Sequence, residues 1–342
     1  MNASAPLPGA KPSRPKLIWA KRALTLMFFI LVPALLFMLV KNLEWQEVKS
    51  ALQSYDAATL ALAIGICFAS YLVYSSFDLL GRLYTRHKLP VRQVLPVVFV
   101  CYAFNLNLTA WVGGIALRYR LYSRLGLNVP TITKIFSLSL ITNWLGYTLL
   151  AGVIFSLGLI QLPPSWSIGA SSLRVIGILL LAAALAYLLA CRLSTRRVWH
   201  IRGQTLTLPS LRLASIQAVL GTLNWSLMAL LIFVLLPEQA FYPSVLGVLL
   251  ISSIAGVVTH IPAGLGVLEA VFIALLHHHI AKSSLLAALI GYRAIYFLLP
   301  LALACLVYLV LEKDAKKLRK HRAAEQPEQN EIKQLHTQDQ GL

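Results

Sequence analysis

Three charged side chains lie inside segments that are otherwise apolar. Arg118 follows the polar stretch at residues 105–114, Glu269 follows a similar stretch at residues 260–266, and Arg293 lies deep in the last apolar run. A charge at the centre of a bilayer costs about 2.5–3.5 kcal/mol on insertion scales, so such residues pair with one another or line a substrate path. The guanidinium is a planar donor fork that suits phosphate, and the carboxylate can pair with a cation or carry a proton.

Two polar, glycine-containing breaks precede Arg118 and Glu269 in the chain. Lipid cannot hydrogen-bond a broken backbone, so irregular chain at membrane depth is buried in protein or lines a wet cavity. Half-helices that start at such breaks point backbone N–H groups inward, where an anionic group is favoured. We therefore predict a substrate-binding site made of Arg118, Glu269, Arg293, Asn105, Gly113, Gly114, Gly264, Gly266, Asn143 and His260.

Several of these residues have a second, purely structural interpretation. Glu269 could pair with Arg118, with Arg293, or with a cationic headgroup or a proton, and an internal ion pair would not exclude a functional role. Asp78 is expected at the membrane interface, paired with Arg82 at i,i+4. Four polar residues could line a cavity or hydrogen-bond freed backbone groups: Asn105, Asn107, Thr109 and Asn143. For the first three we favour the backbone role.

Two further sequence features contain histidine, which can relay protons or bind metals. For His260, which precedes a proline and a turn, we favour a backbone hydrogen bond over a proton relay. The run at residues 277–279 is His-His-His, and consecutive residues of a helix point in different directions, so it does not predict a metal site. The four cysteines lie in apolar segments without metal-ligand spacing. We expect no metal and no cofactor.

Composition indicates an integral membrane protein. Of 342 residues, 58% are hydrophobic and 12% are charged, against about 25% charged in soluble domains. The net charge of +18 is interpreted as charge sorting across a membrane and attraction to anionic lipids, and nucleic acid is not an expected partner. Nucleotide-binding and hydrolase motifs with convincing context do not occur, so we predict that the protein is not an enzyme.

The chain divides by hydropathy into a membrane domain and two polar ends. Residues 1–16 and 313–342 are polar and expected to be disordered cytoplasmic segments, and residues 17–312 form the transmembrane domain. The predicted full spans are residues 23–40, 59–80, 132–160, 173–191, 213–236 and 284–311. Residues 23–40 are too long for a signal-peptide core and are expected to anchor the chain. Residues 196–208 could form a small ribbon.

Basic residues decide how the two remaining apolar segments run. If residues 91–125 crossed the membrane fully, Arg120 and Arg124 would face outward, against the positive-inside rule. A re-entrant hairpin removes the conflict. The basic C-terminal cluster must lie inside, so residues 243–280 form a second hairpin that enters from the outside. The alternative is eight plain spans.

The predicted fold class is therefore an all-α polytopic membrane protein. It has about six full spans and two opposed re-entrant hairpins, with both termini cytoplasmic. Residues 59–151 and 213–311 would be related by an inverted repeat, an arrangement in which breaks at corresponding positions mark the binding site of a transporter.

Particular motifs carry a resemblance to a known family. These include Trp111-Val-Gly-Gly, Arg118-Tyr-Arg-Leu-Tyr-Ser-Arg-Leu-Gly126, His260-Ile-Pro-Ala-Gly-Leu-Gly-Val-Leu-Glu269 and Tyr292-Arg293. The chain resembles the lysylphosphatidylglycerol synthase transmembrane-region family over residues 17–319, and within it a branch of inner-membrane proteins of Gram-negative bacteria. The resemblance implies a polytopic domain that moves lipids between leaflets. The family often has Pro-Gly-Gly where this chain has Pro262-Ala-Gly264, and no soluble aminoacyl-transferase domain is expected here.

Three functions remain open at this point. The first is a flippase-like or scramblase-like translocase for anionic phospholipids, with Arg118 and Arg293 on the phosphate. The second is a non-transporting lipid-binding or scaffold protein that supports a separate lipid-synthesis enzyme. The third is a proton-coupled transporter of small solutes, with Glu269 as the proton carrier.

Overall fold

A computed structural model describes residues 45–108, 114–160, 169–194, 198–201, 204–236, 240–259 and 264–312. The chain separates into two units, residues 1–44 and 45–342, and every described residue belongs to the second. The predicted span at residues 23–40 and both polar ends therefore lie outside the described residues.

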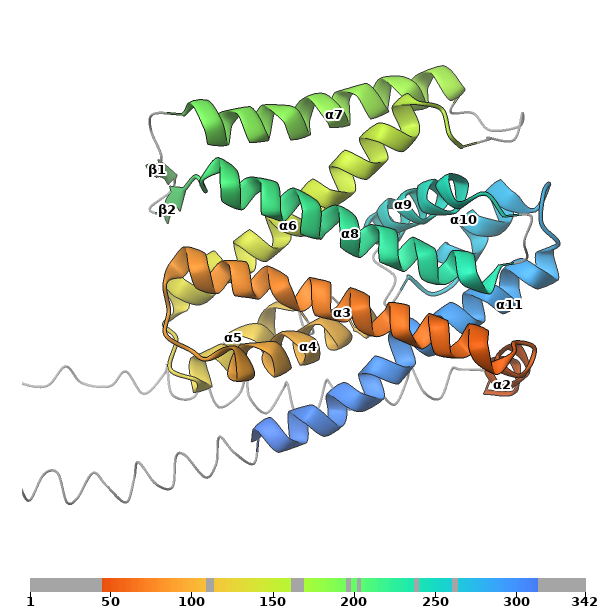
Figure 1. The fold of residues 1–342 in the computed structure, drawn as a ribbon, viewed down its shortest axis with the longest axis horizontal. Helices are drawn as coiled ribbons and strands as arrows, with labels where there is room; N and C mark the ends of the chain where they lie inside the picture. Colours follow the sequence, from red (N-terminus) through yellow and green to blue (C-terminus); the bar gives the residue numbers. More distant parts are fainter. Residues whose placement is uncertain are drawn as a thin grey trace, which may run out of the picture. The chain divides into compact units, whose positions relative to one another are not determined.

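The described part is helical apart from one short β-hairpin (Figure 1). Its helices are α2 (Trp45–Gln53), α3 (Ala57–Thr85), α4 (Val91–Asn107), α5 (Leu117–Arg124), α6 (Val129–Ser156), α7 (Ala170–Leu193), α8 (Leu211–Leu235), α9 (Tyr242–Thr259), α10 (Val267–Leu276), α11 (Lys282–Tyr292) and the π-helix η3 (Arg293–Leu298). Strands β1 (Val198–Ile201) and β2 (Gln204–Thr207) pair antiparallel, with Val198 opposite Thr207. The ribbon predicted at residues 196–208 is thus confirmed.

Six helices in the described ranges are long and apolar enough to cross a membrane, which confirms the all-α polytopic fold. Five of them match predicted spans: α3, α6, α7, α8 and the last helix, which runs from α11 through η3 to Glu312. The sixth is α9, the 18-residue first arm of the second predicted hairpin. Helices α6 and α8 begin at N-cap residues. The side chain of Asn128 accepts a hydrogen bond from the backbone N–H of Thr131, and that of Ser210 accepts one from Leu213.

The return arms of the two hairpins are too short to span a bilayer. Helix α5 has eight residues and α10 has ten, which at 1.5 Å per residue is about 12–15 Å, half of a ~30 Å hydrocarbon core. In Figure 1 helices α4 and α5 enter the bundle from one end and α9 and α10 from the other, and α4 and α9 both end toward its middle. This is the arrangement that the charge count predicted.

Ion pairs at one end of the bundle fix where α5 finishes. Arg124 pairs with Glu312, and the Nη2 atom of Arg120 lies 3.8 Å from the same carboxylate. Glu312 ends the last helix, so the end of α5 and the end of the last helix lie at the same face. A full crossing by α4–α5 would have separated them, so this pairing argues against the eight-span alternative.

Each half of the bundle repeats the order span, hairpin, span. The first half comprises α3, α4–α5 and α6, the second comprises α8, α9–α10 and the last helix, and α7 connects them. This is the order that the predicted inverted repeat requires.

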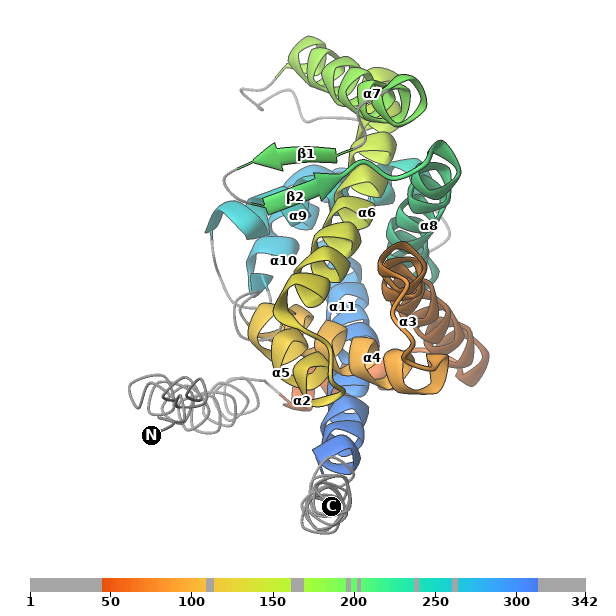
Figure 2. The ribbon, with the colours of Figure 1, turned by 90° about the vertical axis from the view of Figure 1, so that its left-hand side faces the viewer.

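Close helix packing holds the two halves together. Helix α6 packs against α8 and also contacts α9 (Figure 2). At the α6–α8 crossing a Cβ added to Gly146 would lie 2.1 Å from the backbone carbon of Gly221. Small residues at such crossings let membrane helices approach closely, because lipid-embedded helices associate through packing contacts.

Candidate functional site

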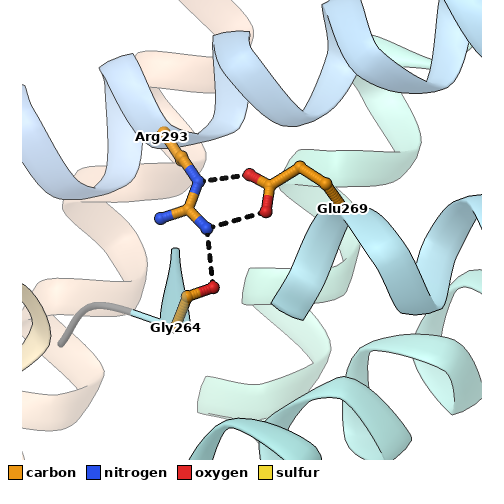
Figure 3. A network of polar contacts seen from close by, with 3 residues as sticks. All are labelled: Gly264, Glu269 and Arg293. Atoms are coloured by element: carbon orange, nitrogen blue, oxygen red, sulfur yellow. Dashed lines mark hydrogen bonds and ion pairs between the residues drawn. The ribbon is translucent and has the colours of Figure 1, made fainter. Parts of the chain in front are cut away.

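The predicted site residues fall into two clusters. Asn105, Gly114, Arg118 and Asn143 line one cavity of about 210 Å³. Glu269, Arg293 and Gly264 form a second, bonded group (Figure 3). Gly266 begins α10 beside that group, whereas Gly113 and His260 lie outside the described residues. Arg293 does not line the cavity, so the structure does not bring the two arginines to one phosphate site.

Arg118 is held by a buried partner that sequence reasoning misassigned. Its Nη2 atom lies 3.1 Å from Oδ1 of Asp78, and the two side chains are 3% and 0% exposed. The other oxygen, Oδ2, accepts a hydrogen bond of 2.7 Å from the hydroxyl of Tyr122. The predicted interfacial pairing of Asp78 with Arg82 is therefore wrong. The hairpin brings α5 back against α3, and the resulting long-range cation displaces the local i,i+4 partner.

The cavity lies among α3, α4, α6, α8 and the start of α5. A Cβ on Gly114 would lie 2.5 Å from Oδ1 of Asn105, so glycine is needed for the amide to lie where it does. On α6 the backbone oxygen of Asn143 accepts the indole N–H of Trp225 at 3.1 Å. Asn105 and Asn143 both line the cavity. Asn105, for which we favoured a hydrogen bond to freed backbone, is therefore found in the lining role instead.

The charge of the lining is one-sided. The guanidinium of Arg118 contributes a cation to the wall, and its carbon lies 5.6 Å from the ring centre of Phe136. The described lining residues include no carboxylate, because Asp78 pairs with Arg118 without lining the cavity. The remaining polar groups are amides and hydroxyls, such as Asn105, Asn143 and Tyr74. The cavity therefore suits a group with one negative charge: Arg118, whose charge is partly neutralised by Asp78, would pair with that group, and the neutral side chains would hydrogen-bond to it.

The second cluster fastens the turn of α9–α10 to the last helix. The Nη2 atom of Arg293 donates to Oε2 of Glu269 at 3.0 Å and to the carbonyl oxygen of Gly264 at 2.9 Å, and its Nε donates to Oε1 of Glu269 (Figure 3). Gly264 and Gly266 have φ of +58° and +78°, a region in which glycine is favoured. Of the partners considered for Glu269, the structure selects Arg293. The bidentate fork gives this pair a defined geometry.

A buried hydroxyl network lies beside the Arg118 cavity, and sequence reasoning did not find it. Tyr102 lines the cavity, and its hydroxyl lies 2.8 Å from that of Tyr296 in η3. Ser70 bridges Tyr296, at 2.7 Å, to Oδ1 of Asn224, at 2.9 Å. The members come from α3, α4, α8 and η3. The only trace in the sequence is the presence of polar residues within apolar runs, without any spacing that would pair them.

The π-helix η3 begins at Arg293 and ends two residues before Pro300. Pro300 lacks an N–H, and its ring clashes with the carbonyl of residue 296 in a regular α-helix. Three carbonyls of η3 instead accept side-chain donors from α3 and α4. These are Ile295 from Cys67 at 3.3 Å, Tyr296 from Tyr71 at 3.1 Å and Phe297 from Asn107 at 3.1 Å. Asn107 thus hydrogen-bonds backbone, as predicted, and this carbonyl belongs to the last helix.

Comparisons with known proteins agree with the resemblance seen in the motifs. The family model described as "Lysylphosphatidylglycerol synthase TM region" matches residues 20–304. The chain is similar to "Inner membrane protein YbhN" of Escherichia coli K12, with 51% identity over 308 residues that cover 90% of this chain and 97% of that protein. It is also similar to "Uncharacterized protein slr0712" of Synechocystis sp. PCC 6803, with 30% identity over 265 residues, 77% of this chain and 82% of that protein.

Proposed function

Because this chain belongs to the lysylphosphatidylglycerol synthase TM region family, we propose that it binds a phospholipid by its phosphate in the Arg118 cavity and moves the lipid between leaflets. The family description concerns a phospholipid, and the related Escherichia coli protein is named as an inner membrane protein. The proposal places this protein in a bacterial inner membrane with both termini in the cytoplasm, and assigns it no catalytic step.

The observation that carries the proposal is a guanidinium in the wall of a cavity at membrane depth. Arg118 is 3% exposed, and the α6 residues that face it, from Phe136 to Asn143, occupy the middle of a 28-residue span. A polar headgroup that crosses a bilayer needs such a place, because hydrocarbon offers it no hydrogen bonds. An ion pair with no further role would not need a cavity beside it.

The charge balance favours a singly charged phosphodiester. Arg118 faces the cavity with Asp78 behind it, so the pair as a whole is neutral and presents its positive end. A phosphodiester brings one negative charge and two free oxygens to the fork. The amides of Asn105 and Asn143 are then available to an uncharged headgroup. The described lining supplies no carboxylate for a cationic headgroup.

The opposed hairpins supply the pathway in this proposal. Hairpins that enter from both ends let irregular, hydratable backbone reach the middle of the bundle from each side. Glu269, engaged by Arg293 and tied to the turn at Gly264, takes a positioning role for the second hairpin. Nothing in this pair favours the proton-coupled solute transporter over the lipid translocase.

The test is movement of fluorescently labelled phosphatidylglycerol in liposomes that contain the purified protein. The informative variant is D78N/R118Q, which removes the cation from the cavity without leaving a buried charge alone. Loss of one charge-assisted hydrogen-bonded contact, about 1.5–3 kcal/mol, should slow movement about tenfold or more. Arg124→Gln is the matched control, because Arg124 is on the same helix and pairs with Glu312 instead of lining the cavity.

Two results would reject the translocase. One is absence of movement by the wild-type protein for phosphatidylglycerol and for zwitterionic phospholipids alike. The other is a D78N/R118Q variant as fast as the wild type. Lipid that is retained but not moved would instead support the lipid-binding scaffold.

A further inference from the structure

A second hollow lies on α6 and α7 next to the Arg118 cavity. We propose that it holds one acyl chain of the lipid whose phosphate lies at Arg118, so that the two hollows form a single site for a glycerophospholipid. This inference rests on the proposed binding of phosphate and adds the place of an acyl chain and the orientation of the lipid.

The second hollow has a volume of about 270 Å³ and an apolar wall. Its lining includes Leu140, Trp144 and Thr148 of α6 and Ala183, Ala184 and Tyr187 of α7. The two hydroxyl groups among them have partners of their own: Thr148 donates to the carbonyl oxygen of Trp144 at 2.6 Å and Tyr187 donates to Oε1 of Gln217 at 3.0 Å. The surface left for an occupant is therefore hydrocarbon and aromatic.

The two hollows adjoin each other along one face of α6. Leu140 lines both of them and is 46% exposed. Phe136 lies one turn before it in the cavity, and Trp144 and Thr148 follow at four-residue intervals in the groove, so all four share a helix face. From Leu140 to Thr148 the groove extends about 12 Å along the axis. A molecule that fills both hollows is polar at one end and apolar at the other.

The location identifies the apolar part as an acyl chain. Helices α6 and α7 are both candidate membrane spans, and acyl chains are the apolar molecules that surround such helices in a bilayer. A water-soluble phosphate ester would use the cavity and leave the groove without a role. The pairing of a cation-lined cavity with an adjoining hydrocarbon groove thus selects a phospholipid over a free phosphate compound.

The direction of the groove gives the bound lipid an orientation. The groove runs from the middle of α6 toward its Ser156 end, so the chain points away from the Val129 end. A lipid in the leaflet at the Val129 end points its chains the same way. This is the end at which α5 finishes and Arg124 pairs with Glu312. The site therefore accepts lipid from that leaflet, with the phosphate drawn toward the middle of the membrane.

The experiment maps where a single acyl chain lies. Wild-type protein in nanodiscs receives a trace of phosphatidylglycerol that carries a diazirine at the end of one chain, and the adducts formed on irradiation are located by mass spectrometry. Ala183→Trp fills the groove. Ala182→Trp is the matched control, because Ala182 is the exposed neighbour and does not line the groove. We expect adducts on residues 144–148 to fall about fivefold in A183W, a loss of about 1 kcal/mol, and to stay within twofold in A182W.

The variant D78N/R118Q tests whether the groove and the cavity hold the same lipid molecule. Its adducts on residues 144–148 should fall as in A183W, because the chain is held there by its own phosphate. Adducts that persist in A183W, that fall equally in A182W, or that persist in D78N/R118Q would each overturn the single-site inference. The readout needs no translocation, so an intact adduct pattern in a protein that fails to move lipid would reject the proposed function and leave this lipid site in place.

Discussion

Replacing Arg118 by glutamine should destabilise this protein far more than replacing Arg118 and Asp78 together. The single change leaves the carboxylate of Asp78, which is 0% exposed, without its cation. Breaking a buried ion pair by removing one partner costs about 3–5 kcal/mol, because the remaining charge is uncompensated. The hydroxyl of Tyr122 still donates to Oδ2 of Asp78, so we expect the lower end of that range, about 3 kcal/mol.

The double variant D78N/R118Q should behave differently. It places two neutral amides where the charges were, and these groups can hydrogen-bond to each other and to Tyr122. Neutral replacement of a buried pair is often close to neutral in stability, so we expect a loss within about 1 kcal/mol. The implied coupling between the two positions is then at least about 2 kcal/mol, far above that of an exposed pair.

The assay is equilibrium unfolding in mixed detergent micelles, followed by tryptophan fluorescence. The wild type, D78N, R118Q and the double variant form a complete mutant cycle, from which the coupling free energy follows directly. Arg124→Gln serves as the control, since Arg124 is 20% exposed in its pair with Glu312 and should lose less than about 1 kcal/mol.

An R118Q variant whose free energy of unfolding falls by less than about 1 kcal/mol would refute the reasoning, because an unpaired buried carboxylate should destabilise the protein by more than that. The reasoning would equally fail if D78N/R118Q were as unstable as R118Q. That outcome would mean that the site depends on the volume of arginine and not on charge.

Three further predictions concern the supports of the site. Gly221→Ala should lower the free energy of unfolding by about 1–3 kcal/mol, because its Cβ would lie 2.3 Å from a backbone oxygen of α6. Gly65→Ala is the control, since its Cβ meets nothing within 4 Å. Equal losses in the two variants would contradict the prediction. Arg293→Lys keeps the charge but loses the two-pronged hydrogen bonding to Glu269. Amide hydrogen exchange in α10 should then become about tenfold faster. Unchanged exchange would show that the Arg293–Glu269 pair does not hold the hairpin. Asn107→Ala removes the hydrogen bond that its side chain donates to the carbonyl oxygen of Phe297 in η3, so it should cost about 1 kcal/mol in the unfolding assay. A loss no larger than in a variant of an exposed asparagine would argue against that role.

The hairpins could be predicted from the sequence because the features that indicate them can be found along the chain without knowledge of its packing. Hydropathy marks the segments, glycine and polar residues mark the breaks, and the basic residues Arg120 and Arg124 exclude a full crossing. The pairing of both arginines with Glu312 agrees with that inference. Sorting charges between faces depends on counting along the chain, so no knowledge of packing was needed.

Side-chain partners were the weak part of the prediction. Asp78 was assigned to Arg82 because a neighbour at i,i+4 is visible in the sequence, whereas its true partner Arg118 reaches it only after the chain has turned back. For Glu269 the sequence offered several cations and could not rank them. In the structure Arg293 is the partner, because the start of the π-helix places its guanidinium beside both Gly264 and Glu269.

By itself the sequence determined the membrane class, the eight apolar segments, the two breaks and the residues that carry charge at depth, because each depends on transfer free energies that add along the chain. The tertiary structure alone decided that Arg118 and Arg293 serve different clusters, that buried hydroxyls of α3, α4 and η3 bond one another beside the Arg118 cavity, and that an apolar groove on α6 and α7 adjoins this cavity at Leu140. These features depend on which helices cross and at what depth. Packing between distant segments sets that geometry, and no local pattern encodes it.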